Sequence, residues 1–525
     1  MQIHPTRAAV DLTIAAILAV AAAVALRLTA VLAWAGALLL GLAIARAVTR
    51  IAVARIRAAG FEMLWREPER ARRIARGERL LLRAEVRNRD TRAARYVGLR
   101  AVASPHLSLS VDPAEGEVPA GGRMEVTVTV TAPRVGRHGI HGLSLEVQGS
   151  PGLFEVPLTF ANPYGIEVLP GPAALSIHSA RGGRSRQVSE SGRPGRPAGE
   201  GSELKELREL SPGDPFKRIA WKASARRGKL MVREYEQDER DVVWLILDAS
   251  VELWSGVPGG APLDLAIDEV AAAANRHLRR GDRVGLAICA ARVLSCLPPA
   301  SGPAQLAAIH AALAHDTATL DADRSDLDEA DVALRVLEHL RPLDPEGASD
   351  VRVTELDRLA RRAVEVKGRA PFDLPEPRAM TPRERVLRGY LAAFGMGSPP
   401  RQEPEQAHTD RSIISALRRA MSERPKPTSV LIWSTAGDLS GRQELEAQLK
   451  STPRRGCQLT WVPMRFGPGL TRGGDVERAV ADALELRAEV QRAKGERALR
   501  RLGVKVARPR AKAAPARQEA DGVSR

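Results

Sequence analysis

The chain has 525 residues, of which 44% are hydrophobic and 27% are charged, and its formal net charge is +16. At roughly 150 residues per domain, this length excludes a single small module and leaves room for about three structural units. The hydrophobic content also excludes wholesale disorder. The three cysteines, Cys289, Cys296 and Cys457, have no CxxC spacing, which excludes a disulfide scaffold and gives no zinc signature. We therefore expect a reducing compartment.

The N-terminal stretch is strongly apolar. From residue 8 to residue 45 the only charged residues are Asp11 and Arg27. This run is nearly twice as long as one straight helix needs to cross a hydrocarbon core of about 30 Å. It therefore predicts two transmembrane helices that turn near Arg27. The alternative is a signal peptide cleaved near residues 21–23, which would leave the second apolar segment embedded.

Basic residues predict the orientation of this anchor. Arg46, Arg50, Arg55 and Arg57 follow the second apolar segment, whereas the turn contains only Arg27. Because basic residues are retained on the cytoplasmic side, we expect a multi-pass protein of the cytoplasmic (inner) membrane whose termini and soluble domains face the cytoplasm.

Residues 66–170 alternate between apolar and polar side chains in short runs separated by Pro and Gly. This pattern predicts an antiparallel, all-β sandwich of immunoglobulin-like architecture. His138 and His141 fall in one predicted strand, three residues apart, so they point to opposite faces and are poor joint metal ligands. Residues 171–200 are rich in Arg, Gly, Ser and Pro, which indicates a flexible basic linker.

Residues 201–240 contain a set of closely spaced short motifs, and they precede the predicted strand that leads to Asp248-Ala249-Ser250. The set comprises Leu207-Arg208-Glu209, Pro212-Gly213-Asp214, Arg218-Ile219, Trp221-Lys222, Ser224-Ala225-Arg226, Leu230 and Val232-Arg233-Glu234. It resembles the signature of the bacterial family called domain of unknown function 58. Members of that family join a β module to a von Willebrand factor A-like domain, and they are commonly linked with MoxR-type AAA+ ATPases. Leu210 and Ala220 depart from the family pattern, in which an aromatic and an acidic residue are usual.

The signature segment has two interpretations. Its acidic and basic side chains form either a salt-bridged collar that packs Trp221 against the next domain, or a docking surface for a partner. The candidate partner-binding residues are Arg208, Asp214, Arg218, Trp221, Lys222, Arg226 and Arg233.

Residues 241–507 alternate short apolar runs with longer helical periods. This alternation predicts an α/β domain with an open, mostly parallel sheet, and the resemblance implies the von Willebrand factor A-like (Rossmann-like) form. Pro-rich pieces and helical patches at 341–427 indicate a long insertion in this domain. Residues 508–525 are predicted to form a basic disordered tail, either solvated or attracted to anionic lipid.

The end of the first α/β strand carries the residues that the resemblance links with metal binding. Metal-binding A-like domains use an Asp-x-Ser-x-Ser loop with a distant Thr and Asp, usually to hold Mg²⁺. Asp248 and Ser250 match this loop, but Glu252 takes the third position. The remaining ligands would be Ser325, Asp326 and Asp438. The alternative is that the loop has lost its metal and Asp248 caps a turn.

We expect a membrane-anchored, non-enzymatic interaction module. The resemblance implies an adaptor that works with a MoxR-type AAA+ ATPase, or with other membrane proteins, in protein maturation or envelope stress. The chain has no Walker loop, so ATP hydrolysis would belong to the partner. A Mg²⁺-dependent hydrolase at the degenerate metal site is the alternative, although no GxSxG or HExxH motif is present. Nucleic-acid binding ranks last, since the basic stretches are nearly free of aromatic residues.

Overall fold

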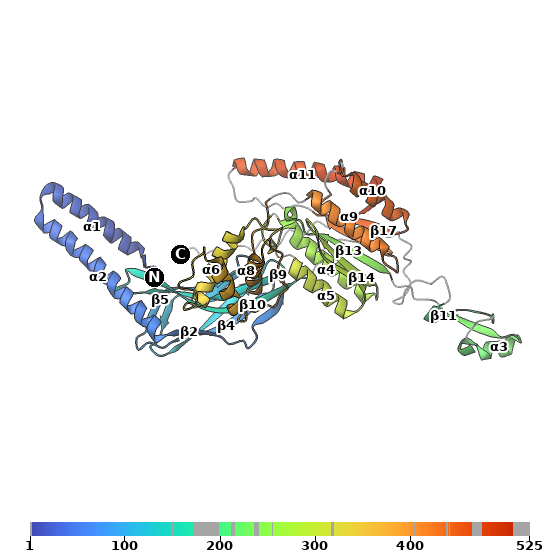
Figure 1. The fold of residues 1–525 in the computed structure, drawn as a ribbon, viewed down its shortest axis with the longest axis horizontal. Helices are drawn as coiled ribbons and strands as arrows, with labels where there is room; N and C mark the ends of the chain where they lie inside the picture. Colours follow the sequence, from blue (N-terminus) through green and yellow to red (C-terminus); the bar gives the residue numbers. More distant parts are fainter. Residues whose placement is uncertain are drawn as a thin grey trace, which may run out of the picture. The chain divides into compact units, whose positions relative to one another are not determined.

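The computed structural model describes residues 3–149, 151–172, 199–211, 216–235, 241–254, 256–316, 320–402, 406–436, 439, 441–464 and 475–507. Most of the predicted linker (173–198) and the whole predicted tail (508–525) lie outside the described residues. The chain divides into two compact units (Figure 1). The first comprises Met1–Gly171 and Thr317–Gln402, and the second comprises Pro172–Asp316 and Glu403–Arg525.

The first unit begins with two long apolar helices, α1 (Arg7–Leu26) and α2 (Thr29–Ala59). Arg27 ends α1 in the left-handed conformation, with φ of 54°, and the chain turns back. Ala9, Ala16 and Ala23, spaced seven residues apart, are buried and let the two helices approach closely. Both helices are long and apolar enough to cross a membrane. The predicted pair of apolar helices turning near Arg27 is confirmed.

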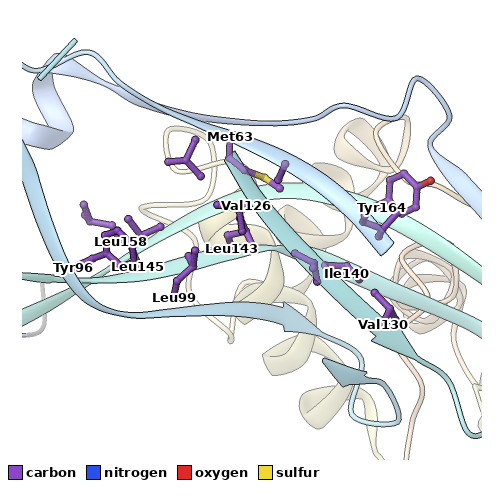
Figure 2. Close-up of a cluster of buried hydrophobic side chains, with 14 of the residues drawn as sticks. Met63, Tyr96, Leu99, Val126, Val130, Ile140, Leu143, Leu145, Leu158 and Tyr164 are labelled. Carbon is purple, nitrogen blue, oxygen red and sulfur yellow. The ribbon is translucent and has the colours of Figure 1, made fainter. Parts of the chain in front are cut away.

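Two β-sheets follow, as the alternating pattern predicted. The six-stranded sheet contains β1 (His4–Pro5), β10 (Phe154–Leu169), β9 (Gly136–Gln148), β5 (Ala94–Ala103) and β7 (Gly116–Val118) in this order, and β3 (Ala71–Ala75) also pairs with β10. The four-stranded sheet has the order β2 (Phe61–Trp65), β4 (Arg79–Asn88), β8 (Arg123–Thr131) and β6 (Ser108–Asp112). Figure 2 shows apolar side chains from both sheets in one core, including Val126 and Val130 of β8 and Leu143 and Leu145 of β9. The β-rich region is thus a packed pair of sheets.

Both ends of the helical pair are fixed to these sheets. Before α1, the short strand β1 pairs with β10. At the end of α2, Val53 and Ile56 belong to the same core as the strands. Arg55, also in α2, forms an ion pair of 2.9 Å with the buried side chain of Asp90. The helices are therefore continuous with the β structure rather than joined to it by a free linker.

A helical segment at 320–402 completes the first unit. Its helices are α6 (Glu329–Leu343), α7 (Leu356–Lys367) and α8 (Pro382–Ala393), and α6 contacts β10. The backbones come very close, because a Cβ atom on Gly139 would lie 2.1 Å from the carbonyl oxygen of Phe394. The hydroxyl of Ser104 donates to the carbonyl of Gly395 at 2.6 Å. The sequence prediction had placed an insertion, 341–427, in the α/β region, whereas the structure groups residues 317–402 with the β sheets. Helical periodicity does not tell which sheet a helix will cover.

The second unit has a mixed α/β region, as predicted. Its sheet has the order β15 (Val293–Ala300), β14 (Arg283–Cys289), β13 (Val242–Asp248), β16 (Ser429–Ser434), β17 (Gln458–Pro463) and β18 (Lys505–Val506). All neighbouring strands are parallel except β15 and β14. Its longer helices are α4 (Pro262–Arg279), α5 (Pro303–Asp316), α9 (Gln406–Ser422), α10 (Gln443–Arg454) and α11 (Asp475–Arg501). Trp244 and Ile246 of β13 share a core with α9 and α10.

Candidate functional site

The carboxyl edge of the parallel sheet holds the first candidate site. β13 ends at Asp248, whose side chain is 0% exposed. One carboxylate oxygen, Oδ1, accepts a hydrogen bond from the backbone N–H of Ser250 at 2.9 Å. The other oxygen, Oδ2, accepts one from the hydroxyl of Ser434 at 2.5 Å. Ser434 is the last residue of the neighbouring parallel strand β16, so the two strand ends meet through this bond.

Burial dominates the electrostatics of Asp248. Removal from water raises the pKa of its carboxyl, the nearby charge of Glu252 acts in the same direction, and the hydrogen bonds from Ser250 and Ser434 oppose the shift. Cys289 is paired with Asp248 on the adjacent strand, and burial raises the pKa of its thiol well above the usual value. This edge therefore disfavours charge on both side chains.

Glu252 contacts the beginning of a helix. It lies in the short 3₁₀ helix η2 (Val251–Trp254), and its Oε1 accepts a hydrogen bond from the backbone N–H of Gln406 at 3.1 Å. Gln406 is the first residue of α9, where backbone N–H groups lack partners within the helix and an acidic side chain is favourable. The same end of α9 is tied to α10, because Arg442 pairs with Asp410. Glu252 thus acts as a structural cap for α9.

The predicted metal ligands are divided between the two units. Ser325 and Asp326 belong to the first unit, where they accept hydrogen bonds from the backbone N–H groups of Leu327 (3.2 Å) and Gln402 (2.9 Å). Asp438 lies outside the described residues. Within the described ranges, no group of three His, Cys, Asp or Glu side chains is arranged to hold a metal ion. The structure brings together Asp248 and Ser250 and adds Ser434, which the sequence reasoning missed although it lies four residues before Asp438.

The family signature segment holds the second candidate site. β11 (Gly199–Glu209) pairs with β12 (Met231–Tyr235), and η1 (Phe216–Arg218) and α3 (Trp221–Arg227) lie between them in the chain. The hydroxyl of Ser224 donates to the carbonyl of Ala220 at 3.0 Å and accepts from the N–H of Met231 at 2.9 Å, which fastens α3 to β12. The buried signature residues therefore maintain the local fold.

Other side chains of the same segment are exposed. Phe216 is 77% exposed and Trp221 is 65% exposed, and Leu230 is also exposed. Around them are exposed basic residues: Lys217, Lys222, Arg226, Arg227 and Lys229. We call these eight residues the hairpin surface. Exposed aromatic side chains next to basic residues are typical of interaction sites.

The other predicted partner-binding residues have mixed positions. Arg233 is exposed, and Arg208 is half-buried with its guanidinium donating to the carbonyl of Glu209 at 3.1 Å. Asp214 and the side chain of Arg218 lie outside the described residues. Phe216 and Leu230 were not in the predicted partner-binding set. The signal that could have added them is an apolar residue next to a basic one in the signature, since Phe216 precedes Lys217 and Leu230 follows Lys229.

Comparison with known families identifies the signature. Residues 206–365 match the family model described as protein of unknown function DUF58. This match supports the DUF58 family that the signature residues predicted. It includes the hairpin surface, Asp248 and the beginning of the helical segment. The comparison with curated proteins finds no match to this chain.

Solved structures share only weak likeness with the chain. PapD-like domain 7 of human CEP192 matches with 14% identity over 21% of this chain and 84% of that domain, with a TM-score of 0.16. The MSP family member WR4 of C. elegans matches with 9% identity over 21% of this chain and 96% of its own, with a TM-score of 0.14. E. coli alpha-2-macroglobulin matches with 13% identity over 81% of this chain and 22% of its own, with a TM-score of 0.15. Scores at this level carry no argument about the function of this chain.

Proposed function

We propose that the protein is a membrane-anchored adaptor that binds a MoxR-type AAA+ ATPase through the hairpin surface. The observation that supports this proposal is the exposure of Trp221 and Phe216 among basic side chains in the signature segment. A collar that packs Trp221 against its own chain would bury this side chain. A docking surface would leave it accessible until the partner binds.

The chemistry of the hairpin surface suits an acidic partner. Trp and Arg are enriched among the residues that dominate binding energy, because a large aromatic ring fills a pocket and a guanidinium pairs with carboxylates. The basic residues would also steer an acidic surface toward α3 and speed association at low salt. Lys229 already pairs with Glu209 at 2.8 Å, so Lys222, Arg226 and Arg227 are the bases that we expect to meet the partner.

The remainder of the chain fits an adaptor role. In this proposal α1 and α2 cross the inner membrane, and the arginines at the C-terminal end of α2 keep the soluble units in the cytoplasm. The packed sheets take an immunoglobulin-like form and the parallel sheet a von Willebrand factor A-like form. A Mg²⁺ ion at the Asp248 edge would need Ser434 to turn its hydroxyl from the carboxylate toward the ion. Hydrolysis there is less well supported, since Asp248 is fully buried and both its oxygens accept hydrogen bonds.

Titration of the purified ATPase against the full chain in detergent tests this proposal. Trp221→Ala should weaken binding by about 30-fold or more, the effect of losing about 2 kcal/mol at a central aromatic residue. Met380→Ala, which truncates another highly exposed side chain in the first unit, is the matched control and should leave binding unchanged. Absence of binding by the unsubstituted chain, or equal binding by Trp221→Ala, would contradict the proposal.

A further inference from the structure

α11 has an exposed N-terminal half with a regular apolar pattern. It is one continuous helix of 27 residues (Figure 1). Every described side chain from residue 479 to residue 487 is exposed, whereas Leu499 near the other end is buried in the core of the α/β region. Leu486 is 64% exposed and Val490 is 50% exposed. A short helix surrounded by water is only marginally stable, so this half of α11 gains from a partner.

Five apolar residues along α11 follow a coiled-coil repeat, whereas the exposed Val480 and Leu484 lie outside it. Ala479, Ala483, Leu486, Val490 and Ala493 are separated by four, three, four and three residues. This spacing places Ala479, Leu486 and Ala493 at position d of a heptad and Ala483 and Val490 at position a. A β-branched residue at a together with Leu at d favours two parallel strands.

The other face of α11 is the one that packs on its own unit. Gly495 and Leu499 are buried, and Ala488 is half-buried. In the same heptad assignment these residues take positions f and c, which lie opposite the a and d positions. Four of the five a and d residues, Ala479, Ala483, Leu486 and Val490, are exposed, and Ala493 is half-buried. Together they form a seam that faces away from the buried residues of α11.

The charges beside the seam determine which pairing is favourable. Position g is occupied by the acidic residues Asp482, Glu489 and Glu496. Position e is occupied by Val480 in the first heptad and then by the basic residues Arg487, Lys494 and Arg501. In a parallel pair each g residue faces the e residue of the next heptad on the other helix, so every one of these pairs joins opposite charges. In an antiparallel pair g faces g and e faces e, which would set like charges against each other.

We propose that α11 binds α11 of a second copy of this chain as a parallel two-stranded coiled coil. Alanine at three of the five seam positions makes the contact thin, so the pair is weak in dilute solution. Any arrangement that concentrates the chains, such as insertion of α1 and α2 into one bilayer, raises its occupancy. This inference does not depend on the hairpin surface or on the identity of its partner.

Cysteine crosslinking of the full chain in lipid vesicles tests the seam. Leu486→Cys at position d should crosslink to Leu486→Cys of a second chain. Leu484→Cys is the matched control, because Leu484 is 56% exposed on the same turn but lies at position b, away from the seam. We expect at least tenfold less crosslinking at 484. Cys289 and Cys457 are buried and Cys296 is half-buried, and the unsubstituted chain gives their background.

Ala479→Cys distinguishes the two orientations. It should crosslink to itself in the parallel pair, whereas an antiparallel pair packs a against d and would place residue 479 opposite an a residue such as Val490. Equal crosslinking at 484 and 486, no crosslinking at 486, or no crosslinking at 479 would overturn the proposal. A third outcome is that the vesicles protect Leu486→Cys from a thiol-labelling reagent while no crosslinked dimer forms. That result would overturn the proposal and assign the seam to lipid.

Charge reversal tests the pairing of e and g. Asp482→Arg and Arg487→Asp should each reduce crosslinking of Leu486→Cys, because each sets like charges opposite each other. The chain with both reversals should regain crosslinking of Leu486→Cys, because residues 482 and 487 again carry opposite charges, with the signs exchanged. A double variant that stays as low as either single variant would refute the parallel pairing.

Discussion

Buried histidine and tyrosine side chains are hydrogen-bonded to one another between the helical segment and the β sheets. They make the first unit sensitive to acid. His339 of α6 has its Nδ1 2.8 Å from the hydroxyl of Tyr390 in α8 and its Nε2 3.0 Å from Nδ1 of His141 in β9. Burial lowers the pKa of His339 to about 3, and His141 adds to the shift. Burial alone lowers the pKa of His141 to about 4. The interface therefore requires neutral imidazoles.

Lowering the pH from 7.5 to 5.0 should weaken this interface. An unfolded histidine has a pKa of about 6.5, so below that pH the unfolded chain binds protons that the folded chain does not bind. The contribution of each neutral imidazole to the free energy of unfolding is complete above about pH 6.5, and it is lost as the pH falls toward the pKa of the folded state. At pH 5.0 the loss is about 2 kcal/mol for each such histidine. His138, whose pKa burial lowers to about 4, adds a third. The sum of about 6 kcal/mol is comparable with the total stability of a domain.

Hydrogen exchange of the full chain measures this loss locally. The opening free energy of the amides in α6 and α8, corrected for the intrinsic pH dependence of exchange, should fall by several kcal/mol between pH 7.5 and pH 5.0. His339→Gln should reduce the difference by about 2 kcal/mol. His408→Gln, which changes an exposed histidine of α9, is the control and should not alter it. Equal opening free energies at the two pH values would refute the reasoning.

Three further substitutions test other contacts by urea unfolding. Gly139→Ala should destabilise the first unit by about 1–3 kcal/mol, because the new methyl group has no room against the facing carbonyl, whereas Gly397→Ala, with open space around it, should be neutral. Arg388→Met should cost about 3–5 kcal/mol by leaving Glu384 buried without its partner at 2.7 Å, and replacing both with apolar residues should recover much of the loss. Asp248→Ala should cost about 1–3 kcal/mol, since two buried donors lose their acceptor, and Asp248→Asn should cost less. An Ala variant at 248 as stable as the unsubstituted chain would contradict the last of these.

Local patterns predicted the local structure. The apolar run with Arg27 at its middle predicted α1 and α2, because length and hydropathy alone determine whether a helix can span a bilayer. The run before Asp248 predicted a buried strand, and β13 ends at that residue. The contact between Asp248 and Ser434 was not predictable in the same way. It depends on which strand lies next to β13 and on the register between them, and neither is written in the spacing of residues along one strand.

The packing of the helical segment against the β sheets was also not predictable from the sequence. The periodicity of α6 and α8 shows an apolar face, but any sheet with a free face satisfies it. Glycines were the available signal: Gly139 and Gly142 lie inside the strand β9, and a Cβ atom on Gly139 would collide with the segment. A glycine within a strand marks a place where another backbone approaches.

The attachment of both ends of the helical pair to the sheets has a mechanical consequence. β1 pairs with the sheet just before α1, and the last turns of α2 lie in the β core. Rotation of the helical pair relative to the sheets would break these contacts. In a bilayer, a change in the tilt of α1 and α2 would therefore also rotate the attached β sheets. Membrane thickness would thereby adjust the direction in which the β-rich unit presents its helical segment to the surrounding solution.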